Sequence, residues 1–178
     1  MRLAGFGRRL ARAATLDGSA YSELAADRSA TGEALLVVLA TGLATGISSL
    51  DEGGARAVRD LPAGILLAFI GWVVGASIAY VAGTKVLRGR QADVSWGMVA
   101  RAVGFAQAPG VLRVFGAIPG LGPTIAIVTL FWQFIAMTVA LRQTLGYTSY
   151  WRPLGVLAIG FIPYIATVWW FTTLLAVS

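Results

Sequence analysis

One run of 22 residues, Leu61–Ala82, contains no charged side chain, and it constrains this chain more than any other feature. A helix needs about 20 consecutive apolar residues to cross the hydrocarbon core of a bilayer. Of the 178 residues, 57% are hydrophobic and only 12% are charged, against about 25% charged in soluble domains. A soluble domain of this size could not bury so much apolar surface. The composition therefore excludes an ordinary soluble domain and a disordered chain, and it predicts an integral membrane protein.

Four further apolar runs predict four more membrane-spanning helices. The expected spans cover residues 34–50, 61–82, 96–117, 124–141 and 154–177. The chain thus divides into a cytoplasmic N-terminal segment, residues 1–33, and a transmembrane domain, residues 34–178. We expect an all-α fold, a polytopic bundle of about five transmembrane helices. Within it, Pro119 predicts a tight turn, and Pro163 predicts a kink in the last span.

The run over residues 96–117 is the least regular, because it contains both arginines and prolines. An arginine at the centre of a bilayer costs roughly 2.5–3.5 kcal/mol. We expect a span that is kinked near Pro109, with Arg101 close to its cytoplasmic end. The alternative is that Pro109 breaks the run into two half-helices, with Arg113 facing either the protein interior or the far headgroups. If this run is re-entrant instead, four spans remain and the C terminus lies inside.

Short charged segments separate the spans and orient them. Residues 51–60 are expected to form a charged loop, after which Pro62 suits the first turn of the second span. With a cytoplasmic N terminus, ten or eleven of the 14 basic residues fall on inner segments and three on outer ones. The positive-inside rule therefore predicts that the N terminus is cytoplasmic and that the C terminus is outside.

Residues 1–14 predict a basic amphipathic helix. On a helical wheel, the apolar side consists of Leu3, Phe6 and Leu10. The basic side consists of Arg2, Arg8, Arg9 and Arg12. Such a helix suits a membrane surface with anionic lipids. The alternative is a basic tail that only enforces the topology.

Small residues recur four positions apart on two of the expected spans. The first span carries Gly42 and Gly46. The second span carries Gly71, Gly75 and Ala79, and Gly83 follows directly after it at the same spacing. This spacing places small residues along one face of a helix and lets a neighbouring helix approach closely. These six residues are therefore the predicted helix-packing positions.

The chain lacks the residues on which most active sites depend. It has no Cys and no His, and no acidic residue lies within an expected span. No P-loop, GxSxG, HExxH or GxGxxG sequence occurs. We therefore expect no catalytic residue, no metal, no cofactor and no nucleic-acid partner. The candidate functional residues are the polar side chains at membrane depth: Arg101, Gln107, Arg113 and Gln133. Their alternative role is to form hydrogen bonds between helices.

Three sequence elements in the second half of the chain carry a family resemblance. An Arg-x-x-Gly-Phe-Ala-x-x-Pro element comprises Arg101, Gly104, Phe105, Ala106 and Pro109. An Ile-Pro-x-x-Gly turn comprises Ile118, Pro119 and Gly122, and a Trp-containing span with an Arg-x-x-Leu tail comprises Trp132, Arg142 and Leu145. Upstream, a looser match comprises Tyr21, Asp27, Thr31 and Ala34. In these elements the chain resembles the Yip family (the Ypt-interacting-protein domain), specifically its prokaryotic branch.

This resemblance implies a multi-spanning, usually five-helix protein with a cytoplasmic N terminus, here in a bacterial inner membrane. Eukaryotic members of the family are linked to Rab-type GTPases, vesicle formation and membrane shaping, but their Asp-Leu-Tyr-Gly-Pro element is absent from this chain. We expect a non-enzymatic membrane scaffold, adaptor or membrane-shaping protein. The alternatives are an accessory subunit of a larger membrane complex and a small transporter or channel. The expected partners are the lipid bilayer, including anionic lipids, and other membrane proteins or further copies of the chain.

Overall fold

The structure is a computed structural model that describes residues 3–48, 55–91 and 93–161. Within these residues the chain is helical and contains no strand. Three helices are long and apolar enough to cross a membrane: Ala30–Ser48, Gly64–Val86 and Gly122–Thr144. These features agree with an integral membrane protein built as a helical bundle.

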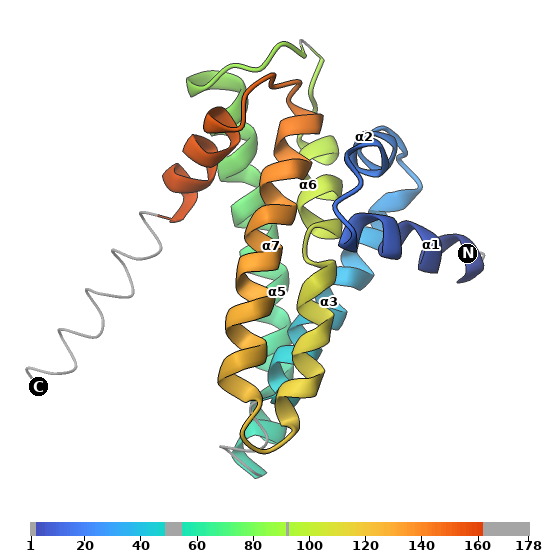
Figure 1. The fold of residues 1–178 in the computed structure, drawn as a ribbon, viewed down its shortest axis with the longest axis vertical. Helices are drawn as coiled ribbons and strands as arrows, with labels where there is room; N and C mark the ends of the chain where they lie inside the picture. The colour runs from blue at the N-terminus through green and yellow to red at the C-terminus, as the bar shows by residue number, and fades with distance from the viewer. Residues whose placement is uncertain (1–2, 49–54, 92, 162–178) are drawn as a thin grey trace, which may run out of the picture.

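Long helices run along the bundle, and short helices cover one side of it (Figure 1). The long helices are α3 (Ala30–Ser48), α5 (Ala55–Val81) and α7 (Gly122–Thr144). Between them lie α6 (Trp96–Phe105) and a 3-10 helix, η2 (Ala108–Ala117). The short helices α1 (Leu3–Ala14) and α2 (Gly18–Ala26) pack against α6 and together form what we call the cap. A further helix covers residues 151–161.

Helix α6 lies at the centre of this arrangement. It contacts α2, α3, α5 and α7, and its seven consecutive residues Val99–Phe105 are all buried. A helix that is buried on every side needs small or apolar residues all round, and apart from Arg101 this stretch provides them. Gly104 lets α6 lie close to α3 and α5, because a Cβ added at this position would lie 2.9 Å from the Ala34 Cβ and 3.1 Å from the Trp72 Nε1.

The third expected span, residues 96–117, is broken rather than kinked. The backbone changes to three-residue bonding at the break, where Gln107 N donates to Gly104 O (3.1 Å) and Gly110 N donates to Gln107 O (2.8 Å). Pro109 has no N–H with which to continue an α-helix, and ten residues of 3-10 helix follow the break. Even so, α6 and η2 follow one another along the bundle (Figure 1).

The second expected span also begins differently. Helix α5 starts at Ala55, within the expected charged loop, so that Pro62 lies inside the helix rather than in its first turn. A proline is tolerated there because neighbouring helices and local adjustments compensate for the missing hydrogen bond in membrane helices. At its other end α5 passes into one π-helical turn, η1 (Ala82–Val86), which is closed by Leu87 N donating to Ala82 O (2.7 Å).

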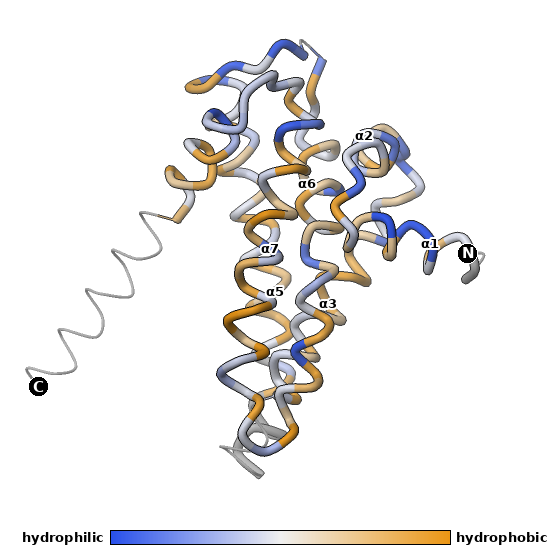
Figure 2. Tube along the Cα trace, in the orientation of Figure 1, coloured by the Kyte–Doolittle hydropathy of each residue, from blue (hydrophilic) through white to orange (hydrophobic). Residues whose placement is uncertain are grey.

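The connections gather at two ends of the bundle. The segments that follow η1 and α7 lie at the same end, and hydrophilic residues are concentrated there and on the cap (Figure 2). The turn between η2 and α7 lies at the opposite end (Figure 1). In that turn Leu121 N donates to Ile118 O (3.0 Å), with Pro119 and Gly120 between them. Gly120 has φ of 81°, a left-handed value that glycine adopts without strain.

The last expected span, residues 154–177, is described only in its first part. The helix over residues 151–161 contains that part. The remainder of the span, including Pro163, lies outside the described residues.

The predicted small-residue positions differ in what they contact. A Cβ added at Gly42 would lie 2.8 Å from the Ala68 Cβ, so this glycine lets α3 approach α5 closely, and Gly46 faces Leu61 in the same way. Around Gly71, in contrast, an added Cβ would meet no atom within 4 Å. These positions therefore differ in the space that they leave for a methyl group.

This difference gives a matched pair of substitutions on α3 and α5. We expect Gly42→Ala to lower the free energy of unfolding by about 1–3 kcal/mol, because the methyl group forces the two helices apart. Gly71→Ala should leave stability unchanged or raise it by about 0.5–1 kcal/mol, because alanine favours the helix. Unfolding of the purified variants in detergent measures both. Equal effects of the two substitutions would show that α3 and α5 do not approach at Gly42.

Candidate functional site

The polar residues expected at membrane depth fall into two separate groups. Arg101 points from α6 to the end of α2 and the start of α3, where its hydrogen-bond partners lie. Gln107, Arg113 and Gln133 are joined to one another farther along the bundle. The two groups therefore have different tasks, one between cap and bundle and one within the bundle.

Arg101 closes the end of α2. Its Nε donates to Leu24 O (3.2 Å) and Ala25 O (3.0 Å), its Nη2 also donates to Ala25 O, and its Nη1 donates to Thr31 Oγ1 (3.3 Å). The residue is only 6% exposed. The last carbonyls of a helix have no partner within it and form the negative end of the helix dipole. A buried guanidinium therefore finds both acceptors and a favourable field at the end of α2.

The C-terminal carbonyls of the other cap helix, α1, accept hydrogen bonds from neutral side chains. Trp132 of α7 donates its indole Nε1–H to Ala14 O (2.8 Å), and Tyr21 of α2 donates its hydroxyl to Ala13 O (2.8 Å). The bundle thus supplies donors to the C-terminal carbonyls of both cap helices. These contacts fix how deep the cap lies along α6 and α7.

Gln107 is the centre of the second group, which we call the core polar cluster. It stands at the break between α6 and η2, where its backbone carbonyl accepts hydrogen bonds from Thr41 Oγ1 (3.1 Å) and Gln133 Nε2 (3.4 Å). Its side-chain Oε1 accepts a second hydrogen bond from Gln133 Nε2 (2.5 Å). Non-helical backbone at membrane depth requires such partners inside the protein. The cluster therefore compensates for the broken helix.

Arg113 extends the core polar cluster across three elements. Its Nη2 donates to Gln133 Oε1 (2.8 Å), its Nε to Thr129 Oγ1 (3.1 Å) and its Nη1 to Thr45 Oγ1 (3.3 Å). Thr45 lies on α3, whereas Thr129 and Gln133 lie on α7. All three acceptors are neutral, and no carboxylate of the described residues pairs with this guanidinium.

Sequence reasoning missed the three threonines of the core polar cluster. Thr41 and Thr45 are four residues apart on α3, and Thr129 precedes Gln133 by four residues on α7. Residues four apart share one face of a helix. Pairs of polar residues four positions apart within an apolar run could therefore have indicated these threonines.

Two of the arginines expected at the membrane surface pair with acidic residues of the protein. Arg9 contacts Asp27 (Nη2–Oδ2, 2.8 Å) and Glu33 (Nη1–Oε2, 3.1 Å). Arg12 contacts Asp17 (Nε–Oδ2, 2.7 Å) and Glu23 (Nη1–Oε2, 2.7 Å). These pairs join α1 to α2 and to the start of α3.

The two remaining arginines of this group differ from Arg9 and Arg12. Arg8 is exposed, and Arg2 lies outside the described residues. On the other face of α1, Phe6 and Leu10 pack against the protein core. Both sides of α1 therefore make contacts within the molecule.

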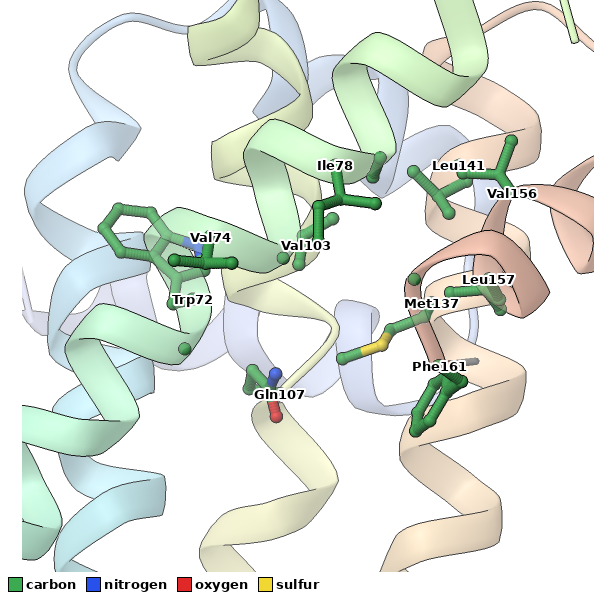
Figure 3. Close-up of a pocket in the computed structure, with 14 residues that line it drawn as sticks. Trp72, Val74, Ile78, Val103, Gln107, Met137, Leu141, Val156, Leu157 and Phe161 are labelled. Carbon is green, nitrogen blue, oxygen red and sulfur yellow. The ribbon is translucent and has the colours of Figure 1, made fainter. Parts of the chain in front are cut away.

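An apolar groove of about 500 Å³ opens between α5, α6, α7 and the helix over residues 151–161 (Figure 3). Trp72, Val74 and Ile78 line one side, and Met137, Leu141 and Phe161 are among the residues of the other (Figure 3). Gln107 lies in the lining as well, and it brings the core polar cluster to the edge of the groove.

The predicted stripe of small residues on α5 is divided by this groove. Gly71 and Gly75 line it, and a Cβ added at either would meet no atom within 4 Å. Ala79 is buried, and Gly83 lies against Leu145, whose Cδ1 would be 2.5 Å from an added Cβ. The stripe therefore packs against the bundle at one end and faces the groove at the other.

The described residues hold no group of three or more His, Cys, Asp or Glu side chains that could bind a metal ion. Gln107, Arg113 and Gln133 form hydrogen bonds with one another and with threonines, whereas Arg101 donates to the end of α2 and to Thr31. Comparison with models of protein families, with curated proteins and with solved structures finds no match for this chain.

The position of Arg101 predicts a large effect of its removal. We expect Arg101→Met to lower the free energy of unfolding by about 2–3 kcal/mol, because two buried carbonyls of α2 lose a charged donor. Hydrogen exchange of the cap amides should rise at the same time. The exposed Arg8 provides the control, and Arg8→Met should change neither quantity. Unchanged exchange in the cap of Arg101→Met would contradict the proposed closure of α2.

The ion pairs of the cap predict a dependence on pH. Hydrogen bonds from Ser19 and Arg12 lower the pKa of Asp17 from 3.8 to about 2. The pKa of Glu23 is lowered by its hydrogen bond with Arg12, and that of Asp27 by hydrogen bonds with Ser29 and Arg9. Carboxylates with a lowered folded-state pKa stabilise the fold fully above their unfolded pKa of about 4, and this contribution is lost as the pH falls toward about 2.

We therefore expect the cap to loosen between about pH 4 and pH 2, before the bundle unfolds. Hydrogen exchange, corrected for its intrinsic pH dependence, should rise in α1 and α2 over this range and stay constant in α7. Asp17→Asn should raise exchange in the cap already at neutral pH, whereas Asp93→Asn, on an exposed residue, should not. Full protection of the cap at pH 2 would contradict this expectation.

Proposed function

We propose that this chain is a non-enzymatic integral membrane scaffold or adaptor of the Yip type, which binds an apolar segment of another membrane protein in its groove. The observation that carries the proposal is the groove itself. It is lined almost entirely by apolar side chains, and two of its positions, Gly71 and Gly75, leave space for a partner to approach the α5 backbone. Small residues at an interface allow such close approach between membrane helices.

The core polar cluster supports a packing role over a transport role. The carbonyl and Oε1 of Gln107, the Oε1 of Gln133 and all three nitrogens of Arg113 make hydrogen bonds within the protein. A polar path for a solute needs groups that exchange partners with that solute. Here the same groups compensate for the break ahead of η2, which favours a structural task for them.

The arrangement of the connections supports the proposed topology. The three segments expected on the cytoplasmic side are the cap and the connections after η1 and α7. The two connections lie at one end of the bundle, and the cap packs on α6 in the half that adjoins that end (Figure 1). The positive-inside rule then favours a cytoplasmic position for this end. The proposed location is the inner membrane of a bacterium.

Filling the groove tests the proposal. We expect Gly75→Leu to reduce co-purification of the partner from native membranes in mild detergent by about tenfold, which corresponds to about 1.4 kcal/mol of binding. Gly64→Leu is the matched control, because Gly64 lies on the same helix, is exposed, does not line the groove and has no atom within 4 Å of an added Cβ. Mass spectrometry of the purified complex gives the identity and stoichiometry of the partner.

Several outcomes would contradict the adaptor function. The chain would not be an adaptor if it purified alone, or if both substitutions had equal effects. Solute flux in proteoliposomes that Arg101→Ala or Arg113→Ala alters would indicate a transporter instead. A change in liposome shape at high protein density, without a partner, would indicate direct membrane shaping.

A further inference from the structure

Arg113 carries a positive charge that the described residues do not neutralise. A guanidinium stays protonated under all ordinary conditions. The three side chains that contact it, Thr45, Thr129 and Gln133, bring hydrogen-bond acceptors but no negative charge. Charged side chains within membrane segments ordinarily pair with another group. The described part of the chain therefore supplies no anion to this site.

The hydrogen-bond donors of Arg113 are not all used. A guanidinium has five N–H groups, and the three contacts occupy one on each nitrogen. One N–H therefore remains on Nη1 and one on Nη2. The contact of Nη1 with Thr45 lies at the protein surface. Two parallel N–H groups on the terminal nitrogens are what a phosphate or carboxylate needs for a bidentate contact.

The guanidinium is also held in place before any ligand arrives. Thr129 Oγ1 donates to Ile125 O (2.8 Å), and Thr45 Oγ1 donates to Thr41 O (2.9 Å), so both hydroxyls are free to accept from Arg113. The third acceptor, Gln133, is fixed by its own hydrogen bond to Gln107. A donor that is already oriented loses little freedom on binding.

The depth of the site selects the kind of anion. Thr129 and Gln133, which accept hydrogen bonds from the guanidinium, are seven and eleven residues from Gly122, the first residue of α7, so the guanidinium lies about 10–16 Å from that end of the bundle. The half-thickness of the hydrocarbon core is about 15 Å, so the guanidinium lies within the leaflet at that end. Local thinning of the bilayer lets a lipid phosphate reach an arginine at such a depth. Exposed apolar side chains for the acyl chains flank the site: Leu43, Leu112 and Phe115.

From these observations we propose that Arg113 binds a phosphate group at the end of the bundle opposite the connections that follow η1 and α7. The chemistry that it recognises is a phosphate group, either the monoanionic diester of a membrane phospholipid or a free phosphate monoester, which is largely a dianion at pH 7. Thr45, Thr129 and Gln133 position the guanidinium and leave its two remaining N–H groups to the phosphate.

Native mass spectrometry of the delipidated, full-length chain tests this proposal. The probes are dioleoyl phosphatidylglycerol, dioleoylglycerol, which has the same acyl chains without the phosphate, and glycerol 3-phosphate, which has the phosphate without the chains. We expect one phosphatidylglycerol to bind about tenfold more tightly than dioleoylglycerol, as the loss of one charge-assisted hydrogen-bonded contact predicts. This comparison uses the unaltered protein and does not depend on the folding of a variant.

Variants then assign the binding to Arg113. Arg113→Gln should abolish the preference for phosphatidylglycerol, and Arg113→Lys should keep part of it. The control is Arg90→Gln, at an exposed residue in the connection after η1, which should keep all of it. If glycerol 3-phosphate displaces the lipid at similar concentration, the phosphate site is served by a soluble ester. If it does not, the lipid is the source. Equal binding of phosphatidylglycerol and dioleoylglycerol to the unaltered protein would overturn the proposal, as would an unchanged preference in Arg113→Gln.

Discussion

The contact between Arg101 and the end of α2 is the interaction on which the arrangement of cap and bundle depends. Arg101 lies in the most buried helix of the described chain, where an unsolvated charge is costly. The carbonyls of Leu24 and Ala25 have the opposite need, because a helix end without donors is also costly. Each group is acceptable only in the presence of the other. The cap is therefore not an appendage to the bundle but the partner that makes a charged residue in α6 possible.

The break after α6 poses the same physical problem inside the bundle. Pro109 interrupts the α-helical hydrogen bonds, and the carbonyl of Gln107, which accepts from Gly110 N (2.8 Å), takes its further donors from side chains. Thr41 and Gln133 supply them from the two neighbouring helices. The polar residues of this chain thus appear where its backbone ends or changes helix type. Their distribution follows the needs of the backbone more closely than it follows any catalytic pattern.

Hydropathy was sufficient to predict a helical bundle with helices that are long and apolar enough to cross a membrane, and the described residues contain such helices, one of which includes most of Leu61–Ala82. Proline chemistry was sufficient to predict an irregularity near Pro109. It was not sufficient to predict ten residues of 3-10 helix, since that geometry depends on donors from α3 and α7. About five spans are expected, and three helices of the described residues are long and apolar enough to cross a membrane. Most of the fifth expected span lies outside the described residues.

Partners that are far apart in the sequence could not be predicted from it. Arg101 donates to a carbonyl 76 residues away, and backbone carbonyls carry no sequence signature. A helical wheel separates the basic and apolar sides of residues 1–14, yet it does not reveal that Asp27 and Glu33 face Arg9. Local sequence patterns thus identify polar residues within apolar segments. Only the tertiary arrangement shows which groups these residues contact.

The 3-10 geometry of η2 restricts the number of residues in this segment more than it restricts which residues they are. With three residues per turn, Gly110, Arg113 and Gly116 align along one edge of the helix, and the two glycines allow that edge to lie against Gln133 and Ser48. Inserting a single residue ahead of Arg113 would rotate its side chain by about 120°, away from both threonines. Relatives of this chain should therefore vary in the outward-facing residues of η2 while they keep the same number of residues between Pro109 and Pro119.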